Sequence, residues 1–179
     1  MRGGLPKAVR VTEKLVPFMA GLFLALCAAV LLLRGSHIPG AVYADLNRDL
    51  SYLSKVGEGR YPLPDSEAFT RRLGEWGIGP SHQVVVYDAG DGSMAAARAW
   101  WLLAWLGKRD GVFILDGGLK AWHAAGFPLS LDAPVIEPGT FVGTPDHRLV
   151  LDAEHLQKRL GQPGLTLIDA RAQPRFRGD

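Results

Sequence analysis

Two apolar runs that flank an almost uncharged helical segment constrain the fold of this chain more than any other feature. The runs are QVVVYD at 83–88 and GVFILDGG at 111–118. The helix expected over 93–106 carries Arg98 as its only charge, so most of its surface should be buried. Continuous apolar strands are typical of a parallel sheet covered on both faces. The order therefore predicts an α/β domain with a mainly parallel sheet flanked by helices.

Further elements fit the same alternation. GAVYADL at 40–46 predicts a short strand after a Pro-Gly turn. In PDSEAFTRRLGEWGIG at 64–79, apolar residues recur at spacings of four and three, which indicates a helix capped by Asp65 or Ser66. LKAWHAAG at 119–126 predicts a short helix stopped by glycine and proline. These elements place the first domain at 37–129.

A change of composition follows this domain. Residues 130–148 are rich in Pro, Gly, Asp and Thr without a helical or strand period, so they are expected to be a linker. Beyond them, LDAEHLQKRLG predicts a helix capped by Asp152, and LTLIDARAQPRFRGD predicts a strand that runs into a basic loop. One helix and one strand cannot form a core. Residues 149–179 are therefore expected to be the start of a second, incomplete domain.

The N-terminal segment, 1–36, is basic and then apolar. Residues 15–33 carry no charge and lie between Lys14 and Arg34. A helix of this length nearly spans a hydrocarbon core of roughly 30 Å. The segment predicts a membrane helix over 15–33, with the basic side kept inside and the protein associated with a membrane. The alternatives are a signal peptide, a buried helix plus strand in a cytoplasmic protein, and a misplaced or frame-shifted start of the coding sequence.

Composition excludes several classes of protein. The chain has 179 residues, long enough for one full core with some length left over. A net charge of +2 argues neither for nor against a partner, and without a stripe of Lys and Arg we expect no nucleic-acid partner. Cys27 is the only cysteine, so a disulfide within the chain is excluded. The five histidines are scattered without metal-ligand spacing. We therefore expect no metal site and no cofactor.

The loop DAGDGS at 88–93 is the candidate functional site. It lies where a parallel strand ends and a helix begins, which is the ligand side of such sheets. Its two glycines let backbone N–H groups converge, and the helix dipole adds positive charge, so the loop is shaped to hold an anion. It lacks the Gly-Lys-Ser/Thr of a P-loop and the Gly-x-Gly-x-x-Gly of dinucleotide sites. Asp88 and Asp91 would suit a metal or an acid pair, but helix capping is the favoured interpretation.

Taken together, the motifs resemble the tandem-domain rhodaneses, which are thiosulfate and 3-mercaptopyruvate sulfurtransferases. The resemblance covers residues 37–179 and implies two domains of one fold. In that family the second domain carries the catalytic cysteine and the first is a non-catalytic copy. The motifs are HIPGA at 37–41, YPLPDSEAFTRRLGEWGIG at 61–79, VVVYDAGDGSMAAARAWWLLAWLG at 84–107, VFILDGGLKAWHAAGFP at 112–128 and LIDARAQPRFRGD at 167–179.

The resemblance places Asp88 where a catalytic copy has its cysteine. In such a loop a thiolate surrounded by backbone N–H groups attacks the outer sulfur of thiosulfate or 3-mercaptopyruvate and becomes a persulfide. A carboxylate suits the same surroundings electrostatically but cannot accept or pass on sulfur. The resemblance thus implies an anion-binding shell without its nucleophile, compatible with a capping role for Asp88. The chain as given is expected to have no catalytic residue and to be inactive alone.

Two arginines are candidates for binding the small anionic sulfur donor. By resemblance, arginines of the DAR…RF segment reach the substrate, and a guanidinium offers a bidentate fork to a carboxylate or thiosulfonate. Arg175 is preferred over Arg171, because the first arginine after such a strand often forms a structural ion pair. Arg177 is expected to be a solvated surface residue.

The N-terminus departs from the family pattern. Tandem rhodaneses begin with a helix and a first strand before the segment that corresponds to HIPGA, and here the apolar run 15–33 stands in their place. We therefore expect a sheet exposed where that strand is missing, and poor stability.

Three functions remain to be compared. The first is a sulfurtransferase truncated early in its second domain. The second is a non-enzymatic rhodanese-like binding or regulatory module, membrane-anchored if 15–33 spans a bilayer. The third, a phosphatase of the related cell-cycle type, fails because such enzymes also need the loop cysteine.

Overall fold

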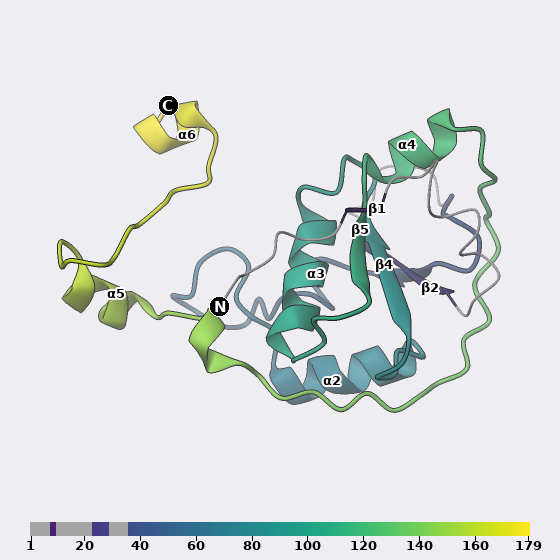
Figure 1. Cartoon of the computed structure of the whole chain (residues 1–179), viewed down its shortest axis with the longest axis horizontal. Helices are drawn as coiled ribbons and strands as arrows, with labels where there is room; N and C mark the ends of the chain where they lie inside the picture. The colour runs from purple at the N-terminus through teal and green to yellow at the C-terminus, as the bar shows by residue number, and fades with distance from the viewer. Residues whose placement is uncertain (1–7, 10–22, 29–35) are drawn as a thin grey trace. The chain divides into compact units, whose positions relative to one another are not determined.

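A five-stranded sheet organises the first part of the chain (Figure 1). The structure, a computed structural model, describes residues 8–9, 23–28 and 36–179. The chain divides into two units, 1–146 and 147–179, and the sheet belongs to the first. All its pairings are parallel, in the order β1-β5-β4-β2-β3, which confirms the predicted parallel sheet. The strands are β1 (Ala8–Val9), β2 (Phe23–Ala28), β3 (Val42–Ala44), β4 (Gln83–Tyr87) and β5 (Val112–Leu115).

Helices on both faces cover this sheet. They are α2 (Ser66–Glu75), α3 (Ala95–Trp105) and α4 (Gly118–Ala124), each within about two residues of its predicted bounds except that α2 ends four residues before the predicted 79. Asp65 caps α2 as predicted, its Oδ1 accepting from Ala68 N at 2.9 Å. The helix ends by Trp76 because Gly77 takes a left-handed backbone, φ +74°.

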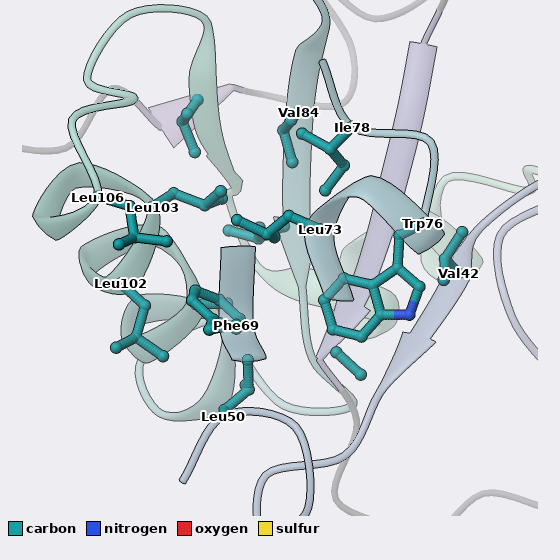
Figure 2. Close-up of a cluster of buried hydrophobic side chains, with 14 of the residues drawn as sticks. Val42, Leu50, Phe69, Leu73, Trp76, Ile78, Val84, Leu102, Leu103 and Leu106 are labelled. Atoms are coloured by element: carbon teal, nitrogen blue, oxygen red, sulfur yellow. The ribbon is translucent and has the colours of Figure 1, made fainter. Parts of the chain in front are cut away.

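Alternate residues of β4 face two separate hydrophobic clusters. Val84 and Val86 belong to the cluster that includes the apolar sides of α2 and α3 (Figure 2). Val85 and Tyr87 belong to a second cluster that includes Leu119 and Trp122 of α4. A strand buried on both faces is what the continuous apolar run predicted. Six residues of α3 are buried, as its lack of charge predicted: Ala95, Ala96, Ala99, Leu102, Leu103 and Trp105.

The structure does not support a membrane helix over 15–33. Residues 23–28 of that run form β2, which lies between β4 and β3, and the rest of the run lies outside the described residues. Within the part of the chain that the structure describes, no helix is long and apolar enough to cross a bilayer. The expectation that this domain lacks a strand before HIPGA is also wrong. β2 supplies one, and it pairs on both of its edges.

The predicted linker is irregular but packed. It has no helix before His147, and its backbone bonds to the C-terminal ends of α2 and α3. Gly139 N donates to Gly74 O at 2.8 Å, and Asp146 N donates to Trp105 O at 2.8 Å. Phe141 is buried in the core cluster of α2 and α3. Residues 131–146 therefore extend the first unit.

The second unit contains three short helices. These are η1 (His147–Leu149), α5 (Ala153–Arg159) and α6 (Gln173–Arg177). Asp152 caps α5 as predicted, accepting from His155 N at 2.7 Å. The predicted strand after residue 164 is wrong: residues 165–170 have no regular structure, and the expected basic loop is α6. A strand needs a partner for its backbone hydrogen bonds, and residues 147–179 include no other strand.

Arg98, the one charge of α3, fastens the long loop between β3 and α2. Its Nε donates to Leu50 O at 2.8 Å, and its terminal nitrogen donates to Tyr61 O and Pro62 O, both at 3.0 Å. Burial lowers the pKa of the guanidinium. Both ends of the loop are thus held by one side chain that is 36 to 48 residues away in sequence.

We expect Arg98→Met to lower the free energy of unfolding by about 2–3 kcal/mol, because three partly buried carbonyls lose a charged donor. Urea unfolding measures the loss. The matched control is Arg60→Met, since Arg60 lies over the Tyr61 ring with its guanidinium carbon 5.3 Å from the centroid. It should change stability little. Equal losses in the two variants would contradict the fastening role.

Candidate functional site

The candidate loop, 88–93, connects the centre of the sheet to α3. Asp88 directly follows β4, and α3 begins at Ala95. The side chain of Asp88 is oriented back into the turn, and the residue is only 6% exposed. A buried carboxylate needs hydrogen-bond donors, so its partners determine what the loop can do.

The donors are backbone N–H groups of the loop and of the first turn of α3. Asp88 Oδ1 accepts from Gly90 N at 3.0 Å and Gly92 N at 2.9 Å, and Oδ2 accepts from Ala96 N at 3.3 Å. Ala96 lies in the first turn of α3, so Asp88 satisfies one free N–H group of that turn, as the capping interpretation predicted, although the residue at the N-cap position is Met94. The N–H groups converge as the glycines predicted. They converge on the carboxylate of Asp88, which occupies the anion position itself.

The start of α4 packs against the backbone of this loop. Leu119 N donates to Asp88 O at 3.0 Å. A Cβ on Gly118 would lie 2.3 Å from Gly90 O and 2.9 Å from Asp88 O, and Gly118 has φ +56°. Close backbone contact of this kind is available only to glycine. The turn between β5 and α4 therefore fixes the position of the Asp88 loop.

Asp91 is exposed and acts locally. It accepts from Ser93 N at 3.0 Å, and the hydrogen bonds from Ser93 hold the pKa of this carboxyl below its ordinary value. The favoured interpretation of Asp91 as a cap of α3 is wrong, because its backbone partner, Ser93 N, lies in the loop before the helix. Residues 88–91 and 93–95 line a mainly apolar hollow of about 140 Å³, and Met94 among them is largely exposed. The loop offers carboxylates and one hydroxyl, but no thiol.

The HIPGA segment lies against the end of β4. Ile38 N donates to Tyr87 Oη at 3.0 Å, in a buried contact one residue before Asp88. His37 and Ser130 pair through two backbone hydrogen bonds, of 2.9 and 2.8 Å. The sequence motif therefore marks a structural junction at the edge of the sheet where the candidate loop lies. The sequence indicated that a buried strand ends at Tyr87. It did not indicate that the Tyr87 hydroxyl would bond to Ile38.

Arg171 and Arg175 belong to the second unit. Arg171 makes an ion pair with Asp169, its Nε lying 2.8 Å from Oδ2, and this pair raises the pKa of the guanidinium. Arg175 lies on α6 and is exposed, as is Arg177. Among the described residues, Arg175 makes no hydrogen bond or ion pair. Its guanidinium is therefore free to bind a ligand, whereas that of Arg171 is engaged.

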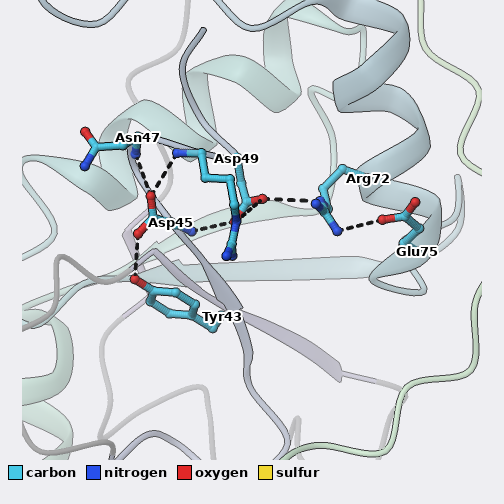
Figure 3. A network of polar contacts seen from close by, with 7 residues as sticks. Tyr43, Asp45, Asn47, Asp49, Arg72 and Glu75 are labelled. Carbon is cyan, nitrogen blue, oxygen red and sulfur yellow. Dashed lines mark hydrogen bonds and ion pairs between the residues drawn. The ribbon is translucent and has the colours of Figure 1, made fainter. Parts of the chain in front are cut away.

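A further charged group, which sequence reasoning missed, follows β3. Asp49 is buried and is paired with both Arg48 and Arg72, and Arg72 in turn contacts Glu75 (Figure 3). The signal was present in the sequence as DLNRDL, a cluster of charges directly after a predicted strand at the ligand edge of the sheet. No group of three or more metal-ligating side chains is found in the described part of the chain.

The fold and the loop together define a class of protein. A parallel sheet covered on both faces, with a loop of backbone N–H groups curled around the first residue after a central strand, is the architecture of a rhodanese-like domain. The family described as Rhodanese-like domain matches residues 31–125, more than half of the chain. The chain belongs to the rhodanese family.

Two relatives of this chain are named as sulfurtransferases. The chain is 58% identical over 145 residues to a Pseudomonas aeruginosa protein named "Probable 3-mercaptopyruvate sulfurtransferase", covering 80% of this chain and 51% of the relative. It is 34% identical over 143 residues to the human 3-mercaptopyruvate sulfurtransferase, covering 79% of this chain and 47% of that protein. The chain thus spans about half the length of these relatives.

A solved structure agrees with the fold. The crystal structure of SseA from Escherichia coli, described with the rhodanese fold of 3-mercaptopyruvate sulfotransferases, matches with a TM-score of 0.82 at 25% identity. The match covers 97% of this chain and 70% of SseA. The similarity therefore includes the residues beyond the first domain.

Proposed function

We propose that this chain is the non-catalytic first domain, with the opening elements of the second, of a sulfurtransferase that moves sulfane sulfur from thiosulfate or 3-mercaptopyruvate to a thiol or cyanide. The names of its relatives support the reaction class. The observation that carries the assignment of the domain is the Asp88 carboxylate, which takes up the backbone donors of the loop.

The chemistry explains why this carboxylate makes the loop non-catalytic. A cysteine thiolate attacks the outer sulfur of thiosulfate, a new S–S bond forms, the old S–S bond breaks and sulfite leaves with its electron pair. The persulfide then passes its outer sulfur to the acceptor and the thiolate returns. A carboxylate oxygen cannot form this reversible bond to sulfur. In a two-domain sulfurtransferase of this kind, the cysteine that does so is expected in the second domain.

Arg175 is proposed to bind the anionic donor. A guanidinium matches a carboxylate or thiosulfonate through two parallel N–H bonds. Arg175 is free for this among the described residues, while Arg171 is held by Asp169 at 2.8 Å. We therefore propose that Arg171 mainly stabilises the turn beside it, and that its contribution to substrate binding is smaller than that of Arg175.

The first test is the assay of residues 1–179 with thiosulfate or 3-mercaptopyruvate as donor and cyanide as acceptor. Thiocyanate formation should stay at the background of the buffer, because the described loop has no nucleophile that accepts sulfur. Cys27→Ser should change nothing. Turnover above background in both chains would overturn the proposal, since Asp88 or another group would then be competent.

A gain of reactivity tests the loop itself. In the Cys27→Ser background, Asp88→Cys places a single thiol among N–H groups that bind the carboxylate at 2.9–3.3 Å. These donors should lower the pKa of the introduced thiol below about 8.5 and speed its alkylation by iodoacetamide at pH 7 by about tenfold over the urea-unfolded chain. Mass spectrometry of the alkylated protein measures it.

The control places the thiol where no donors converge, by Ser93→Cys in the same background. Ser93 is exposed and lies outside the ring of donors. The thiol it introduces should react like that of the unfolded chain. Equal rates for the two folded variants would show that the loop does not stabilise an anion.

The alternative, a binding module that uses this loop to hold an external anion, is not favoured by the geometry. Three backbone donors that such an anion would need are bonded to Asp88. We therefore place external ligands of the first domain elsewhere.

A further inference from the structure

The first unit has a larger cavity, separate from the Asp88 loop. Its volume is about 420 Å³, and it lies between the loop that follows β3 and the exposed side of α2. None of its lining residues belongs to 88–95, which surround the smaller hollow. Three arginines line it, Arg48, Arg71 and Arg72, together with the buried Ser51. The nature of its ligand follows from which polar groups are already engaged.

Three carboxylates line the cavity, and each accepts a hydrogen bond from the protein; Asp65 accepts from Ala68 N at 2.9 Å at the start of α2. The side chain of Asp49 is 1% exposed. Its Oδ1 lies 3.2 Å from both Arg48 Nε and Arg72 Nε, and its Oδ2 accepts from Asp45 N at 2.8 Å and from an Arg48 terminal nitrogen at 3.0 Å (Figure 3). Glu75 accepts from Arg72 at 2.7 Å. The carboxylates of Asp49 and Glu75 therefore hold the arginines in place. They are not available to bind a cation.

The donors are in excess. A guanidinium has five N–H groups, and Arg48 and Arg72 each use their Nε and one terminal nitrogen on carboxylates. Arg71 makes no hydrogen bond or ion pair with any described residue. The Ser51 hydroxyl is buried and also lacks a partner there. Less than 1 Å² of this oxygen is accessible, so it does not face a ligand in the cavity, and its missing partner costs about 1–3 kcal/mol within the fold.

An acceptor-only ligand satisfies this set. We propose that the cavity binds a small organic carboxylate, with the Arg71 guanidinium as its principal charged partner and the unused N–H groups of Arg48 and Arg72 as further donors. The cavity is in the size range of small-molecule sites. Tyr52 and Pro64 supply apolar wall beside the arginines, which suits an organic body better than a bare inorganic ion. The site is independent of the sulfur-transfer assignment.

Benzoate is the probe, titrated into the 179-residue chain and followed by amide chemical shifts. Saturable shifts are expected at residues 48–52 and 65–72, and benzyl alcohol, the neutral analogue, should give none of comparable size. Arg71→Gln should weaken binding by about tenfold or more, because a charge-assisted hydrogen bond is lost. Arg60→Gln removes another arginine that does not line the cavity, and it should leave the affinity unchanged.

Urea unfolding of Arg71→Gln distinguishes a loss of binding from a loss of folding. Its midpoint should be unchanged, because Arg71 makes no hydrogen bond or ion pair with any described residue. The proposal is overturned if benzyl alcohol binds as well as benzoate, or if Arg71→Gln has no effect. It is also overturned if inorganic phosphate binds as tightly, which would indicate a site for simple ions. Arg175→Gln should not affect this site, so these outcomes stand apart from the sulfur-transfer assays.

Discussion

Gly118→Ala is expected to lower the free energy of unfolding by about 3–4 kcal/mol, one of the two largest single-residue effects we predict for this domain. The backbone at Gly118 has φ +56°, a left-handed conformation that disfavours any Cβ. The added Cβ would also lie 2.3 Å from Gly90 O and 2.9 Å from Asp88 O. Both neighbours are backbone atoms, so relief requires moving the Asp88 loop or the start of α4.

Gly126→Ala is the matched control. Gly126 also has a left-handed backbone, φ +77°, but a Cβ there would meet nothing within 4 Å. Its cost should be the conformational term alone, about 1 kcal/mol. Urea unfolding of both variants measures the difference. Similar losses would show that the close approach between α4 and the loop contributes nothing beyond backbone conformation.

The parts of the fold that the sequence predicted well are those whose signals are local. The apolar runs at β4 and β5 and the periodic helix of α2 needed only their own residues. The strand expected after residue 164 failed for the opposite reason. LTLI has strand-forming residues, but a strand exists only with a partner, and no sequence pattern within residues 147–179 supplies one. The membrane helix expected over 15–33 failed similarly, because apolar length alone does not distinguish such a helix from a strand inside a sheet, such as β2.

The candidate site was predictable in position and less so in its contacts. The strand, glycines and helix located the loop, and the resemblance identified Asp88 as its distinctive residue. That the carboxylate would bond to three N–H groups of its own turn depends on side-chain orientation, which spacing does not specify. The contacts of Arg98 and the Ile38 to Tyr87 bond join residues 36 to 49 positions apart. Such contacts are determined by tertiary packing, so no local sequence pattern predicts them.

The N–H groups around Asp88 donate their hydrogen bonds to its carboxylate, so this turn has a structural role in the folded domain. The same donors in a catalytic rhodanese loop would stabilise a thiolate and its persulfide. Asp88 therefore supplies the negative charge that the loop geometry favours, but it cannot form the persulfide. This predicts that the domain depends on Asp88 for stability, and that the effect can be measured without any assay of sulfur transfer.

Asp88→Ala should lower the free energy of unfolding by about 3 kcal/mol. The substitution leaves the N–H groups of Gly90, Gly92 and Ala96 without their acceptor, and two of these three contacts are buried. Asp88→Asn keeps one side-chain oxygen as an acceptor, so its loss should be about half as large. Urea unfolding measures the stability, and amide hydrogen exchange should be faster at these three positions in Asp88→Ala.

Asp91→Ala provides the matched control, because Asp91 is an exposed carboxylate of the same loop with one backbone partner, Ser93 N at 3.0 Å. It should change the unfolding midpoint little and leave the exchange of Gly92 and Ala96 as in the unsubstituted chain. If Asp88→Ala were as mild as Asp91→Ala, the donors around Asp88 would have to be satisfied by water. The loop would then be an open anion site after all, and the binding-module alternative would regain its physical basis at this position.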